Sequence, residues 1–179
     1  MEKHANTRVI VAVENEHQAE GTQHWVERML NRDAAGFPVE YPVEYWMLNQ
    51  ERPLERRLRG NERLVLSLEN PRHVEQSNPI AGGILWISKK HPCSLVGNLL
   101  DLESELGDFS GAYFDSRGRG IFFQDVEGRD FYPLQEATLD EPIQEQLLAA
   151  VCIARAAGVS AGSVMKALGS PSPVRLKAA

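Results

Sequence analysis

Short apolar runs separated by a segment with helical spacing are the feature that most constrains the fold of this chain. Val9 to Val13 is apolar at every position, and Leu64 to Leu68 is interrupted only by Ser67. A half-exposed strand alternates polar and apolar residues, so an unbroken run indicates a strand buried on both faces, as in parallel sheets. Between the two runs, Trp25, Val26 and Met29 recur at the spacing of a helix. Strands that alternate with helices are typical of an α/β fold, and an α+β fold is also compatible.

The remaining elements follow from the same signals. We expect further strands at 39–48 and 83–88, the first at a sheet edge or with a bulge because Pro42 opens it, and helices at 51–59 and 93–106. From Gly111 the pattern changes to short strands at 112–115, 121–125 and near 131–132, joined by Gly-containing turns. This indicates an antiparallel meander in a mixed sheet.

A helical hairpin is expected to close the chain. Asp140 is placed to begin a helix that runs to about Ala157. The sequence therefore predicts three parts: an α/β unit at 1–110, a meander at 111–135 packed on it, and a hairpin with a basic tail at 140–179.

The segment 147–169 has the order of small, apolar and turn residues that two steeply packed helices need. Ala154 is small where the helices would cross, and Gly158 can end the first helix in a left-handed conformation. Val159 would fill the corner, and Ser160 can cap the second helix through its hydroxyl.

These residues resemble the helix-turn-helix of bacterial repressors of the LacI-like class, and nothing in 1–139 resembles a known family. The resemblance implies that the second helix lies in the major groove of double-stranded DNA with its early positions exposed, Gly162 and Met165 among them. Among these early positions of the second helix, only Lys166 belongs to the residue types that make bidentate contacts to bases. The DNA-binding residues expected on this basis are Ser160, Ala161, Ser163, Lys166, Arg175 and Lys177.

Charge is distributed unevenly along the chain. The 179 residues carry a formal charge of −6, but no acidic residue follows Glu145, whereas four basic residues do. The first 145 residues therefore carry −10 and the last 34 carry +4. A basic tail after a helical hairpin favours contact with phosphates, and the leading hypothesis is a DNA-associated or regulatory protein. It would act as a homodimer or with a protein partner, and the N-terminal part would serve oligomerisation or the sensing of a partner or ligand.

Two other classes of function remain open. In the first, the hairpin is a protein-interaction surface without nucleic acid, and it presents Ile143, Leu147, Val151, Val164 and Leu168 to another subunit. In the second, Glu14 and Glu69, which follow two of the expected parallel strands, hold Mg²⁺ in a phosphoryl-transfer enzyme.

Against the enzyme, the sequence has no Gly-rich phosphate loop and no Walker-type lysine motif. We therefore expect no catalytic residues, no metal and no cofactor. The sequence shows no apolar segment long enough for a membrane span, and its two cysteines, Cys93 and Cys152, lie far apart. The cytoplasm is the expected location.

Overall fold

The structure of the protein is a computed structural model. It describes residues 8–30, 43–47, 62–69, 83–90, 110–115, 117–125, 127–134, 139–169 and 174–176. The helices expected at 51–59 and 93–106, Cys93 and Lys177 lie outside these residues.

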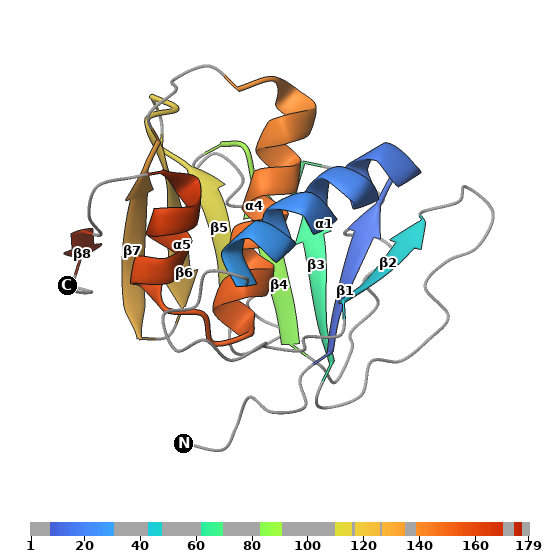
Figure 1. Ribbon diagram of the computed structural model, residues 1–179, viewed down its shortest axis with the longest axis horizontal. Helices are drawn as coiled ribbons and strands as arrows, with labels where there is room; N and C mark the ends of the chain where they lie inside the picture. The colour runs from blue at the N-terminus through green and yellow to red at the C-terminus, as the bar shows by residue number, and fades with distance from the viewer. Residues whose placement is uncertain are drawn as a thin grey trace.

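In the part of the chain that the structure describes, a single mixed sheet of eight strands, in the order β2-β1-β3-β4-β5-β6-β7-β8, forms the centre (Figure 1). The prediction of an α/β fold is confirmed. The strands are β1 (Arg8–Val13), β2 (Val43–Met47), β3 (Glu62–Ser67), β4 (Gly83–Ser88), β5 (Ser110–Phe114), β6 (Gly120–Asp125), β7 (Gly128–Pro133) and β8 (Val174–Leu176).

The apolar runs form parallel strands inside the sheet, as predicted. β1 pairs in parallel with β2 on one side and with β3 on the other, and residues Val9 to Val13 are all buried. β2 is an edge strand, in agreement with the position of Pro42. Because β1 leads through a helix to β2 while β3 lies on its other side, the strand order reverses between β1 and β3.

The meander is continuous with the parallel part of the sheet. β5 is parallel to β4 and antiparallel to β6, and β6, β7 and β8 follow in antiparallel pairs. β8 was not predicted from the sequence. It occupies the tail that we expected to follow the hairpin as a basic segment, and Arg175 stands opposite Asp130 in its register with β7.

Three helices are described: α1 (Glu16–Leu30), α4 (Glu141–Ala156) and α5 (Ala161–Leu168). Figure 1 shows them on the same side of the sheet, with α1 crossing α4. α4 contacts β3 to β6 on one side and α1 and α5 on the other. None of the helices in the described parts of the chain is long and apolar enough to cross a membrane.

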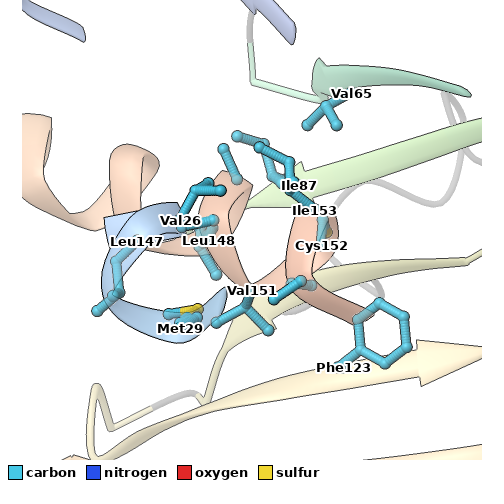
Figure 2. Close-up of a cluster of buried hydrophobic side chains, with 14 of the residues drawn as sticks. Val26, Met29, Val65, Ile87, Phe123, Leu147, Leu148, Val151, Cys152 and Ile153 are labelled. Atoms are coloured by element: carbon cyan, nitrogen blue, oxygen red, sulfur yellow. The ribbon is translucent and has the colours of Figure 1, made fainter. Parts of the chain in front are cut away.

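The position of α4 makes it the centre of the core. Every residue from Gln146 to Ala154 is buried, so the helix has no solvent-facing side over these nine positions. Figure 2 shows α4 side chains packed with Val26 and Met29 of α1 and with strand residues such as Ile87. Burial of each large aliphatic side chain stabilises the fold by about 1.5 to 3 kcal/mol.

The corner between α4 and α5 has the predicted local structure. Gly158 has a φ of 82°, a left-handed conformation that disfavours a side chain, and Val159 is buried beside it. The Ser160 hydroxyl caps α5 by accepting a hydrogen bond from the Ser163 backbone N–H at 3.2 Å. Asp140 is the N-cap residue of α4, but its side chain makes no capping hydrogen bond.

Candidate functional site

A pocket of about 450 Å³ lies at the carboxyl ends of the parallel strands. Glu14 follows β1, Glu69 follows β3 by two residues, and Lys89 follows β4. The first residues of α1 and of α4 close it. The lining residues are Glu14, Asn15, His17, Gln18, Glu69, Lys89, Glu141, Pro142, Glu145 and Gln146. Open α/β sheets bind their ligands at this edge, where the strand order reverses.

Lys89 lies among the carboxylates that line this pocket. Its ammonium lies 3.3 Å from a carboxylate oxygen of Glu145 and 3.8 Å from one of Glu141. Burial alone would lower the pKa of Lys89, but Glu145, Glu141 and Glu69 outweigh it and raise the pKa above its usual range. Lys89 therefore remains protonated at neutral pH, which suits an electrostatic role and not that of a nucleophile.

Glu69 is fixed by the neighbouring strand. Its Oε1 accepts hydrogen bonds from the Ser88 hydroxyl at 2.9 Å and from the Lys90 backbone N–H at 3.1 Å. Within the described chain, the other oxygen, Oε2, is enclosed and has no hydrogen-bond partner. The Glu69 carboxylate is thus held in position through one oxygen, while the other oxygen is covered by protein atoms.

The beginning of α1 is unsuited to an anion. The Asn15 side chain accepts a hydrogen bond from the Gln18 backbone N–H at 2.9 Å, and the Gln18 side chain accepts one from the Glu14 backbone N–H at 2.8 Å. Amide groups that would otherwise bind a phosphate are thus occupied by side chains of the protein. Four carboxylates against one ammonium also give the lining a formal charge of −3, with His17 counted as neutral.

Glu14 and Glu69, the pair considered for Mg²⁺, do line one pocket. Across the residues that the structure describes, however, no three His, Cys, Asp or Glu side chains are grouped as ligands of a metal ion. Elsewhere, Cys152 is fully buried in α4, and burial raises the pKa of its thiol. It is a core residue.

The residues expected to read DNA fall into different environments. Ser160 and Lys166 are exposed and Ala161 is half-buried. The expected exposure of Ser163 and Met165 is wrong, because both side chains are buried, at 5% and 1% exposure. They point into the core since α5 packs on α1, α4 and β7. Lys177 lies outside the described residues, and Arg175 is described only through its backbone pairing in β8.

Arg155, one of the four cations behind the charge of the tail, faces the interior. Its Nη2 lies 3.0 Å from a carboxylate oxygen of Asp130 on β7, and its Nη1 donates a hydrogen bond to the Val159 carbonyl at 2.8 Å. The guanidinium also lies 5.4 Å from the centre of the Phe123 ring. Arg155 thus connects α4 with the meander.

The surface considered for another subunit is also largely internal. Leu147, Val151 and Val164 are at most 1% exposed within the chain itself, and Ile143 and Leu168 are half-buried. The expectation that these residues face a second subunit is wrong for the three buried ones, because α4 is covered by the sheet on one side and by α1 and α5 on the other.

The sequence analysis missed most of the pocket. It identified Glu14 and Glu69 but not Lys89, although Lys89 follows β4 just as Glu14 follows β1. It also missed Glu141 and Glu145, whose spacing of four residues places them on one side of α4. The signal that could have identified Lys89 was the recurrence of charged residues after the ends of strands.

Comparison with known proteins identifies no family. No protein-family model and no curated protein matches the chain. Among solved structures, MurF from Acinetobacter baumannii is similar with a TM-score of 0.49 and 14% sequence identity. The match covers 97% of this chain and 47% of that one, so the chain spans about half the length of MurF. A likeness at this level transfers no function to the chain.

Proposed function

We propose that this protein is a regulatory ligand-binding protein, and that its ligand is a small organic cation bound in the pocket at the ends of β1, β3 and β4. The observation that carries the proposal is a pocket of about 450 Å³ with a formal charge of −3, located where open α/β sheets bind ligands. Pockets of about 300 to 1,000 Å³ accommodate small molecules.

The arrangement around Lys89 indicates the chemistry of the ligand. Three carboxylates raise the pKa of this one primary ammonium, so the pocket already stabilises an ammonium group of its own. The remaining negative charge of the lining favours an additional N–H donor. A diammonium compound supplies such a donor together with positive charge, whereas a phosphate would meet four carboxylates in the lining.

Calorimetric titration with putrescine tests this proposal. We expect saturable binding, no binding of the neutral diol of the same length, and affinity lowered about tenfold in Glu69→Gln and in Glu145→Gln, each of which removes one charge. Glu20→Gln, which removes a charge from an exposed position of α1, is the matched control and should bind like the wild type.

Titrations with magnesium chloride and with sodium phosphate separate the alternatives. Putrescine affinity that is the same in Glu69→Gln and in Glu20→Gln would show that binding reflects only the overall negative charge. Saturable Mg²⁺ binding without putrescine binding would favour the metal-dependent alternative. Phosphate binding would contradict the electrostatic argument for this pocket.

A second proposal is DNA association through α5. The observation that favours it is that the exposed Ser160 caps α5 and that α5 carries the exposed Lys166. With Ser163 buried, readout of bases would depend on Ser160, Ala161 and Lys166, and tight binding would need a homodimer that places two copies of α5 on one duplex.

A gel shift over a salt series tests the second proposal. DNA binding should weaken steeply between about 50 and 200 mM salt and should be reduced by Lys166→Glu. Absence of binding at the lowest salt concentration would remove this proposal and leave the first untouched. We place both activities in the cytoplasm, on the grounds of the two widely spaced cysteines.

A further inference from the structure

A second cavity, of about 250 Å³, lies at the other end of α1. Trp25 and Arg28 line it from α1, Leu147 from α4, and Leu168 and Gly169 from the end of α5. Leu134, directly after β7, and Leu139, two residues before α4, line it as well. The cavity is thus bounded by all three described helices.

The lining of this cavity differs in polarity and charge from that of the pocket at the ends of β1, β3 and β4, the acidic pocket. Four leucines and an indole line this cavity, and none of the described residues in the lining carries a carboxylate. The charged group is Arg28, whose guanidinium lies 5.2 Å from the centre of the Trp25 ring. This placement holds the cation at the rim by a cation–π interaction, beside an apolar interior.

We propose that this cavity binds a small amphipathic carboxylate, with the apolar part among the leucines and the carboxylate on Arg28. Charge complementarity favours the anion, because the charged side chain among the described lining residues is the Arg28 guanidinium, which would repel an amine. Guanidinium and carboxylate also match in geometry through two parallel hydrogen bonds. The volume suits a chain or ring of modest size and not a helix of a partner protein.

Occupancy of this cavity would couple α5 to the rest of the core. Leu168 is the last residue of α5, and Gly169 ends it in a left-handed conformation with a φ of 76°. A ligand in contact with both of these and with Trp25 of α1 would hold the end of α5 in place. This proposal is independent of the organic cation proposed for the acidic pocket, because the two pockets share no residue.

Sodium octanoate is the probe for the test, with octanamide as its neutral counterpart. We expect saturable quenching or enhancement of tryptophan fluorescence by octanoate, with affinity at least about tenfold above that of octanamide, which corresponds to about 1.4 kcal/mol. Arg28→Glu should weaken octanoate binding by at least the same factor. Arg117→Glu, the same charge change at an exposed hairpin position outside the lining, should leave it unchanged.

A variant that fills the cavity, Leu134→Trp, provides the second measurement by calorimetry. Loss of octanoate binding, with an unchanged circular dichroism spectrum, supports the proposal. Equal octanoate affinities in wild type, Arg28→Glu and Leu134→Trp would overturn it, as would the absence of saturable binding in the wild type.

Discussion

The two helices of the C-terminal hairpin have the same local sequence character but opposite environments. α4 is enclosed between the sheet and two helices, and its middle has no exposed side. α5 is one-sided: Val164, Met165 and Ala167 are buried, whereas Gly162 and Lys166 are exposed. The difference shows that a corner of two helices can be encoded correctly by its turn residues while those residues carry no information on what each helix packs against.

The same contrast applies to charge. Arg155 of α4 is directed inward onto Asp130, while Lys166 of α5 is exposed. The charge of +4 of the last 34 residues therefore includes both a cation paired inside the fold and an exposed one. Only a cation on the outer side of the hairpin can contribute to a field that a phosphate would meet.

The largest expected effect is on the stability of the fold, and it distinguishes α4 from α5. Leu148 is fully buried in the middle of α4. We expect Leu148→Ala to lower the free energy of unfolding by about 2 to 5 kcal/mol, because the lost transfer energy adds to the cost of a cavity. Unfolding in urea, followed by circular dichroism, measures the change.

Leu168→Ala, at the half-buried end of α5, is the matched control for this comparison. It removes the same atoms from a side chain that keeps part of its surface in water, so we expect a loss of about 1 kcal/mol. Equal losses for the two variants would contradict the contrast between an enclosed and a one-sided helix.

The ion pair between α4 and the meander should give the next largest effect. Asp130→Ala leaves the Arg155 guanidinium without its carboxylate in a site that is mostly buried. We expect a loss of about 2 to 3 kcal/mol, somewhat less than for a fully buried pair, because the Arg155 side chain retains 20% exposure.

The double variant Asp130→Ala with Arg155→Leu separates the pair from its surroundings. Removal of both charges eliminates the uncompensated cation, so the double variant should be more stable than Asp130→Ala alone. Simple addition of the two single losses in urea unfolding would show that the two residues act independently and that Arg155 does not depend on Asp130.

Much of the fold could be predicted because its determinants are local. The unbroken run at Val9 to Val13 predicted a buried strand, and Gly158 and Ser160 predicted the corner and the cap of α5. Strand order, the parallel pairing of β4 with β5, and β8 depend on contacts between distant segments. No local pattern specified them.

The site was predictable only in part for the same reason. Glu14 and Glu69 could be placed at the ends of strands, but their sharing of one pocket required β1 and β3 to be neighbours. The inward direction of Ser163 also depended on what covers α5. The function suggested by the hairpin stays a prediction, because a helical corner serves a buried core as well as a DNA-binding surface.

A smaller effect is expected at the two helix caps, where a substitution should destabilise α5 more than α4. Ser160 accepts a hydrogen bond from the Ser163 backbone N–H, whereas the Asp140 side chain makes no such bond. We expect Ser160→Ala to cost about 1 kcal/mol. Asp140→Ala should cost only about 0.3 kcal/mol, through its charge near the helix dipole. Urea unfolding of the two variants in parallel checks this, and a larger loss at Asp140 would contradict it.

The smallest effect concerns the part of α4 that does meet solvent, its first five residues. Glu141 and Glu145 there pair with Lys89, whose pKa is raised in the folded protein above its usual 10.5. A raised folded pKa means that the stabilisation is fully present below that usual value and is lost as the pH rises through the folded value. We expect a coupling between Lys89 and Glu145 of about 0.2 to 1 kcal/mol, since the pair is partly exposed.

A double-mutant cycle of Lys89→Met and Glu145→Gln, measured by urea unfolding at about pH 8 and again near pH 11.5, tests both the size and the sign of this coupling. The coupling should shrink at the higher pH, because deprotonation of Lys89 removes the charge that Glu145 attracts. Coupling that grows with pH would contradict the charge arrangement of the pocket. Coupling as large as the loss at Leu148 would show that the solvent-facing start of α4 stabilises the fold as strongly as its enclosed middle.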